Sequence, residues 1–237
     1  MRFRWMCGVF VTIAVLWACV AISAQQKQTP AAKKEPETVQ GRADVLKSSW
    51  GSKTEVLMKG NVKFTSSEIT LTSDEVTYDK QAKSAVSPGK IAITGSDADI
   101  TADKGTADFN KRLAVLTGGV NMVLKPKSEN HSDPDSVRAK MTKPTTITCS
   151  KLEYQYKAKL VTAVGEVRFK QEKRSAEAQK AVYDSNTELL VLTGDVKGVD
   201  EHGQTFSAPL VRISLKEGDE WMEAENASAS FKIDLDE

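Results

Sequence analysis

The side chains of this sequence that could do chemistry are a series of aspartates, two histidines and a few cysteines. The aspartates recur along the chain, at Asp74, Asp79, Asp103, Asp108 and Asp184. General acid–base catalysis needs two carboxylates held together at one point. Aspartates spread at intervals are instead typical of turns and strand ends, where they accept backbone hydrogen bonds. We therefore interpret this series as structural.

The histidines and the cysteines do not form a reactive pattern either. His131 and His202 lie in polar loops, and neither has a second histidine or a cysteine nearby at a metal-ligand spacing. Cys7 and Cys19 lie near the N-terminus, which leaves Cys149 alone in the rest of the chain, where we expect a small buried residue. No phosphate-binding loop, nucleophile elbow or catalytic triad pattern occurs. The sequence predicts no enzyme activity, no metal site and no cofactor.

The overall charge excludes one class of partner. The 33 Lys and Arg residues are balanced by 32 Asp and Glu residues, which gives a formal net charge of +1. A nucleic-acid-binding protein of this size would show a basic surface, so we predict no nucleic-acid partner. The content of 40% hydrophobic but only 6% aromatic residues favours many half-buried strands over a large globular core.

The N-terminus has the layout of a targeting segment. Basic residues precede an uncharged apolar run from Cys7 to Ile22, and small residues follow it. This run is shorter than the roughly 20 residues of a membrane span. We predict a signal peptide over residues 1–24, cleaved after Ser23 or Ala24. A retained N-terminal anchor and lipidation at Cys19 are the alternatives.

Residues 25–40 form a second segment without apolar periodicity. They are rich in Gln, Lys, Pro, Thr and Glu, a composition typical of a disordered linker. From residue 41 to 237 the sequence shows short alternating runs with β-branched residues, separated by Gly, Asn and Asp, and no helical periodicity. We therefore predict one all-β domain over residues 41–237.

Five glycines divide this domain into related segments: Gly60, Gly89, Gly118, Gly165 and Gly194. Successive glycines are 29, 29, 47 and 29 residues apart. The long interval contains a polar insertion at residues 126–143, and removal of its 18 residues restores the period. A fixed period of this length indicates a repeat architecture of about five and a half units.

Apolar residues recur at fixed positions within each unit. An aliphatic residue stands two positions after each glycine, and in four units a second apolar residue follows two positions later. This alternation places both side chains on one face of a strand. We predict that the following residues line one continuous inner face: Val62, Phe64, Ile91, Ile93, Val120, Met122, Val167 and Phe169. Tyr78, Tyr154 and Tyr183 share another repeat position, where we expect them to serve packing.

Each unit is too small to bury its own apolar face, so the units must stack. We expect short strands joined by Gly and Asp turns, stacked into a twisted, antiparallel, two-walled roll. The first and last copies are degenerate, and the unpaired strands at both ends would accept a strand from another chain.

Several of these segments resemble one family, the OstA-like domain of lipopolysaccharide-transport proteins. The similarity rests on residues 60–62, on 100–103 with 107–108, on 116–120 and on 193–196, the last of which repeats the Gly-x-Val element. It covers nearly all of the predicted domain. The resemblance implies an antiparallel β-jellyroll, or taco, that is open at both ends and stacks with other domains of this kind.

The resemblance also implies a function. It implies a periplasmic lipid-transfer protein that holds acyl chains of lipopolysaccharide or a related glycolipid in a hydrophobic groove formed by the eight inner residues. Its partners would be other OstA-like domains or further copies of itself, and stacking would bridge the inner and outer membranes. A membrane-anchored subunit of the same family is one alternative. A structural β-solenoid with a dry interior is another, although the small inward residues Gly105, Ala107 and Ala181 favour a groove.

Overall fold

The computed structural model describes residues 39–49, 54–66, 69–126, 143–216 and 218–230. The predicted signal peptide, nearly all of the linker and nearly all of the 126–143 insertion lie outside these ranges. Gln40, which we assigned to the linker, already belongs to the first strand. All regular elements in the described ranges are strands, so the all-β prediction is confirmed. No helix in these ranges is long and apolar enough to cross a membrane.

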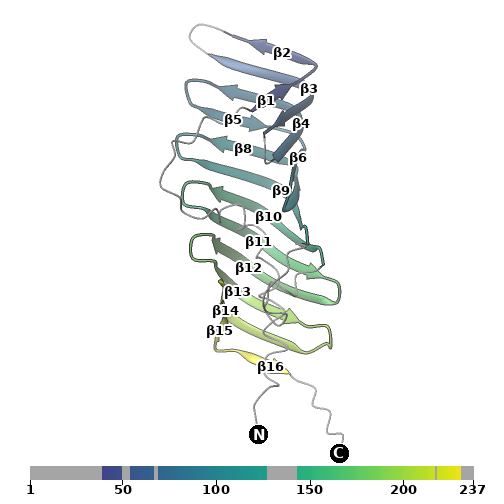
Figure 1. Cartoon of the computed structure of the whole chain (residues 1–237), viewed down its shortest axis with the longest axis vertical. Coiled ribbons are helices and arrows are strands. Elements are labelled where there is room, and N and C mark those ends of the chain that lie inside the picture. The colour runs from purple at the N-terminus through teal and green to yellow at the C-terminus, as the bar shows by residue number, and fades with distance from the viewer. Residues whose placement is uncertain (1–38, 50–53, 67–68, 127–142, 217, 231–237) are drawn as a thin grey trace, which may run out of the picture.

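The strands form one long antiparallel sheet that follows the chain order from one end of the molecule to the other (Figure 1). The sixteen strands are β1 Gln40–Arg42, β2 Val45–Ser48, β3 Glu55–Thr65, β4 Ile69–Asp79, β5 Ser84–Ser87, β6 Ile91–Gly95, β7 Ala98–Ala102, β8 Lys104–Asp108, β9 Leu113–Leu124, β10 Thr145–Gln155, β11 Leu160–Gln171, β12 Arg174–Asp184, β13 Leu189–Val199, β14 Thr205–Lys216, β15 Asp219–Glu225 and β16 Ser228–Ser230. From β8 to β15 each strand pairs with the next strand in sequence, as stacked hairpins require. Around the two breaks the order differs, since β5 pairs with β8, β6 with β4 and β7 with β9.

The period glycines lie inside long strands rather than between short ones. Gly60, Gly118, Gly165 and Gly194 have φ values of 73° to 82°, and the residue after each also has a positive φ. The ladder register shifts at these points, which identifies them as β-bulges. Our expectation of several short strands per unit was therefore wrong, because a left-handed residue pair bends a strand without ending its pairing.

Each bend places the two halves of a strand in different walls. We call wall A the half that ends at the four-residue turns on the left edge of Figure 1, and wall B the half that ends at the opposite edge. A polar side chain of the chain segment opposite the bulge lies over each bulge glycine. A Cβ atom on Gly60 would come within 2.5 Å of Asp44, and one on Gly165 within 2.7 Å of Ser150. Only glycine fits under these side chains.

Gly89 is the exception among the period glycines. It has no positive φ, and its strand is broken there, with β5 ending at Ser87 and β6 starting at Ile91. Pro88 lies in the break and has no amide hydrogen to continue the ladder. Two buried hydroxyls support this corner instead, since Ser73 and Ser87 are hydrogen-bonded over 2.6 Å.

The turns of wall A use the aspartates that recur in the sequence. The carboxylate of Asp79 accepts hydrogen bonds from the backbone amides of Gln81 and Ala82, and Asp108 and Asp184 act in the same way in the next turns. The hydrogen bond from the amide of Lys111 lowers the pKa of Asp108. The structural interpretation of these three aspartates is confirmed.

The bulge geometry predicts that one added methyl group lowers the stability of the fold strongly. Gly165→Ala should lower the free energy of unfolding by at least about 2 kcal/mol, because it adds a left-handed alanine and displaces Ser150. Gly203→Ala is the matched control, since Gly203 also has a positive φ but a Cβ there meets nothing within 4 Å. Gly203→Ala should lower the free energy of unfolding by only about 1 kcal/mol. Urea denaturation of both variants measures the difference, and equal losses would contradict the close approach of Ser150.

Candidate functional site

The inner face of the roll begins at a row of residues beside the bulges, which we call the corner row. In each rung of this row a large aliphatic side chain faces a small one on the paired strand, and every member is at most 8% exposed. The pairs are Val62–Ser73, Ile91–Ala102, Val120–Cys149, Val167–Ala178 and Val196–Ala208. Such pairs keep the volume per rung nearly constant, so the two walls pack closely where they meet.

A second row lies one step farther from the corner in wall B, and we call it the trough row. Its members are paired from strand to strand: Phe64, Leu71, Ile93, Ile100, Met122, Ile147, Phe169, Ala176, Gly198 and Phe206. The first four are only partly buried. This row forms a continuous apolar strip along the roll.

The structure brings all eight predicted residues onto this one face. Val62, Ile91, Val120 and Val167 lie in the corner row, and Phe64, Ile93, Met122 and Phe169 lie in the trough row. The sequence reasoning missed five members that the return strands contribute, namely Leu71, Ile100, Ile147, Ala176 and Phe206. Their alternation with polar neighbours was a usable signal, but alignment on the glycines covered only the strands that follow them.

Wall A contributes tyrosines and small residues to the inner face. Tyr183 is fully buried, as expected for a packing residue. Tyr154 is 40% exposed, which corrects the same expectation for that residue. Between Tyr78 on β4 and Tyr154 on β10 the paired residues are alanines: Ala85, Ala107 and Ala114. This part of wall A is therefore lined by little more than methyl groups.

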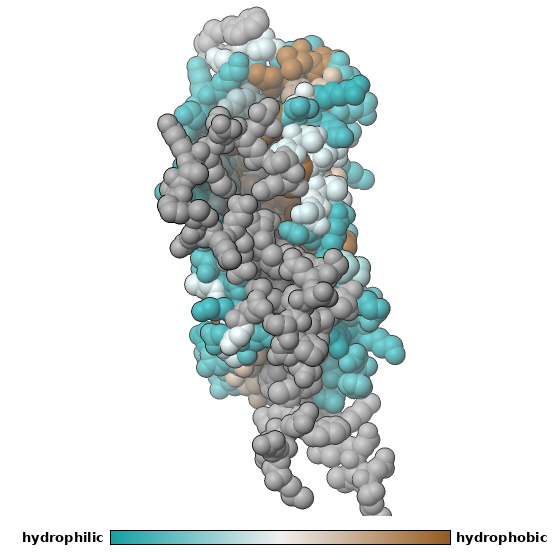
Figure 2. Space-filling view, in the orientation of Figure 1, coloured by the Kyte–Doolittle hydropathy of each residue, from teal (hydrophilic) through white to brown (hydrophobic). Residues whose placement is uncertain are grey.

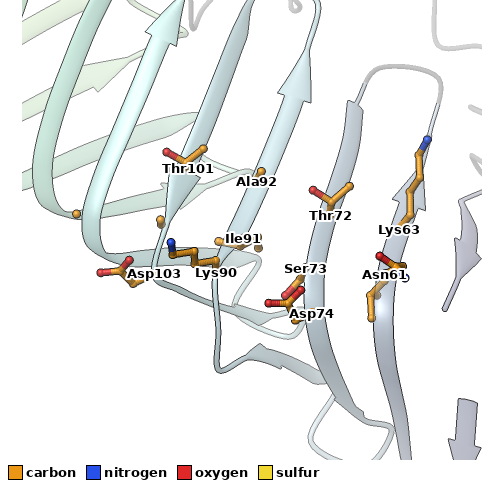
Figure 3. Close-up of a pocket in the computed structure, with 13 residues that line it drawn as sticks. Asn61, Lys63, Thr72, Ser73, Asp74, Lys90, Ile91, Ala92, Thr101 and Asp103 are labelled. Atoms are coloured by element: carbon orange, nitrogen blue, oxygen red, sulfur yellow. The ribbon is translucent and has the colours of Figure 1, made fainter. Parts of the chain in front are cut away.

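An open cleft of about 730 Å³ lies beside the broken strand (Figure 3). Ile91 and Ala102 of the corner row line it, together with polar residues such as Lys90 and Asp103. Its two lysines are matched by two aspartates, so it has no net charge to select an ion. No group of metal-binding side chains occurs within the described ranges.

Cys149 is the small partner of Val120 in the corner row, as predicted for a buried cysteine, and is 7% exposed. Burial raises the pKa of its thiol to about 11. Since the thiolate is the reactive species, this thiol is nearly inert at neutral pH. It packs rather than reacts.

The strands and the two rows define a class of protein, a repeat-built antiparallel β-jellyroll with one continuous apolar inner face. A sequence profile described as "LptA/(LptD N-terminal domain) LPS transport protein" matches residues 99–219, which is more than half of the chain. The chain belongs to this family of lipopolysaccharide-transport proteins, as its resemblance to the OstA-like domain indicated.

The chain was also compared with solved structures and with curated protein sequences. Among solved structures, the chain is similar to LptH of Pseudomonas aeruginosa, described as the LptA homologous periplasmic component of the lipopolysaccharide transport device. The sequences are 19% identical, the TM-score is 0.42, and the match covers 53% of this chain and 82% of that one. No curated protein sequence matches the chain significantly.

The raised pKa of Cys149 predicts slow alkylation. At pH 8 the folded thiol should react with iodoacetamide at no more than about one hundredth of the rate of an exposed thiol, because its thiolate fraction is about that much smaller. The modified peptide is quantified by mass spectrometry, which separates Cys149 from Cys7 and Cys19. Unfolding in urea should restore the full rate, and fast labelling of the folded chain would contradict the buried position.

Proposed function

We propose that this protein carries lipid, with the acyl chains of its cargo held in the trough between the two walls. The observation that carries the proposal is the unbroken strand-to-strand pairing of the trough row from Phe64 to Phe206. Each acyl CH₂ removed from water contributes about 0.8 kcal/mol, so a continuous apolar strip holds a long chain well. A strip without fixed polar contacts also lets the chain slide along it.

The cargo that fits this proposal is lipopolysaccharide or a related glycolipid. The family to which the chain belongs is named for lipopolysaccharide transport, and several acyl chains on one head group need a long trough rather than a closed pocket. We place its action in the periplasm, after export directed by residues 1–24. The proposed role is physical transfer, without catalysis.

We further propose that the roll joins other OstA-like domains, or further copies of itself, end to end and so bridges the inner and outer membranes. Strands β1 and β2 form one end of the described sheet, and β15 and β16 form the other. Val45 and Leu46 on β2 are 44% and 63% exposed. Figure 2 shows apolar side chains gathered at this upper end of the roll, where an added strand would cover them.

Site-specific photo-crosslinking in cells tests the trough. A photoreactive amino acid at Phe64, Ile93 or Phe169 should capture lipid, because these side chains lie in the trough row. The same amino acid at Thr77 or Thr106, on the outer face of wall A, should capture none. Lipid adducts are identified by mass spectrometry of the purified protein.

Two outcomes would contradict the trough. Equal labelling of inner and outer positions would indicate mere proximity to a membrane. A structural scaffold with a dry interior predicts no lipid adduct at either set, and only protein adducts near the ends of the roll.

The end strand β2 offers a separate test of assembly. The amide of Ser49 donates to Glu55 of β3, and hydrogen bonding alternates along an antiparallel pair, so the amide of Leu46 points to the open edge. Leu46→Pro should therefore remove an edge donor, spare the pairing with β3, and weaken self-association at least about tenfold in sedimentation. Leu46→Ala controls for the lost side chain. If both variants and the parent stay monomeric without binding partner domains, the end-to-end proposal fails.

A further inference from the structure

The wall A turns carry a charge pattern that lipid transfer along the trough does not require. We define the basic rim as the turns at residues 79–83, 108–112 and 155–159. Together they contain six Lys or Arg residues and two Asp residues, which leaves a formal charge of +4. The next turn on the same edge, residues 184–188, has two acidic residues and no basic one. Among the fully described turns of this edge, the positive charge therefore lies in three neighbouring turns.

The opposite edge of the roll carries little net charge. Its described residues between strands, at 66, 96–97, 125–126, 143–144, 172–173 and 200–204, contain four acidic residues and three lysines. The positive charge of the basic rim therefore has no counterpart at this edge. Nothing in the packing of the inner face demands this difference.

Hydrogen bonds join the turns of the basic rim in series. The amide of Phe109 donates to the carbonyl of Lys83, the amide of Tyr156 to that of Arg112, and the amide of Ser185 to that of Lys159. Turns on one edge follow every second strand, so neighbouring turns lie about 10 Å apart. This spacing is close to the Debye length at physiological salt, so the charges act together on a large anionic surface.

The two acids of the basic rim do not cancel its charge outward. Asp79 and Asp108 accept hydrogen bonds from amides of their own turns, and Asp108 also forms an ion pair with Lys111 over 3.2 Å. Lys80, Lys83 and Lys157 are exposed to solvent. The rim therefore presents several cations directly to water.

Exposed aromatic rings accompany these cations. Phe109 is 49% exposed and packs edge-on against Tyr78, with ring centroids 5.8 Å apart. Tyr154 and Tyr156 at the next turn are 40% and 36% exposed. Their ring centroids are 6.3 Å apart. Aromatic side chains beside Lys and Arg are the combination that binds the head-group layer of a membrane. The turn amides of Phe109 and Tyr156 are already used between turns, which disfavours addition of a peptide strand here.

We propose that the basic rim is a docking surface for an anionic lipid bilayer. The cations attract the charged head groups, and the rings of Phe109, Tyr154 and Tyr156 enter the head-group layer. The roll then lies along its wall A edge on the membrane.

Vesicle flotation of the full chain tests this surface. The rim variant combines Lys80→Gln, Lys83→Gln, Arg112→Gln and Lys157→Gln. The control variant removes the same charge from exposed lysines on the outer faces of the walls, by Lys104→Gln, Lys170→Gln, Lys180→Gln and Lys197→Gln. Use of the full chain keeps the contribution of the N-terminal apolar segment equal in every variant.

The rim variant should bind vesicles of phosphatidylcholine with phosphatidylglycerol at least about tenfold more weakly than the parent at low salt. The affinity of the control variant for the same vesicles should fall less than about threefold, because its altered charges lie away from the contact. Binding to vesicles of phosphatidylcholine alone should be the same for all three proteins.

Three outcomes would overturn the proposal. Equal losses in both variants would show that only net charge matters, and no loss in either would assign membrane binding to another part of the chain. A loss confined to dispersed short-chain phosphatidylglycerol, with vesicle binding intact, would assign the rim to cargo head groups. None of these results depends on lipid capture at the trough row, so failure here and failure of the proposed function remain distinguishable.

Discussion

The structure depends on one backbone constraint, namely that an antiparallel ladder must turn a corner in the middle of its strands and keep its hydrogen bonds. A pair of residues with positive φ meets this constraint at Gly60, Gly118, Gly165 and Gly194. Because the pairing continues on both sides of the bulge, each strand belongs to two walls, and the walls enclose an apolar inner face. Where Pro88 prevents this geometry, the strand breaks and the Ser73–Ser87 hydroxyl pair supports the corner.

The same bend decides how the inner face is filled. Beside the bulge the walls are closest, and there each rung pairs one large aliphatic residue with one small residue. One step farther out, the trough row changes along the roll. Phe64, Leu71, Ile93 and Ile100 are only partly buried, whereas the members from Met122 to Phe206 belong to the hydrophobic core or are buried beside it. The same row therefore presents apolar surface toward one end of the roll and stabilises the fold toward the other.

Regular stacking of the repeats also brings side chains that are far apart in the sequence together on one surface. Turns that are 29 or 47 residues apart in sequence become hydrogen-bonded neighbours at one edge. Basic residues that look evenly scattered along the chain thereby gather in the basic rim. An apolar inner face and a charged edge therefore coexist in one small domain.

The sequence by itself determined the repeat, the all-β class, the turn role of Asp79, Asp108 and Asp184, and the face of all eight inner residues. These properties are local, because alternation along a strand encodes the face of each side chain. The tertiary structure decided that the glycines are bulges within strands, that Leu71, Ile100 and Ile147 join the trough row, and that Tyr154 is exposed. It also decided which turns share an edge. These properties depend on pairing between distant strands, and single-chain periodicity contains no information about which strands are neighbours.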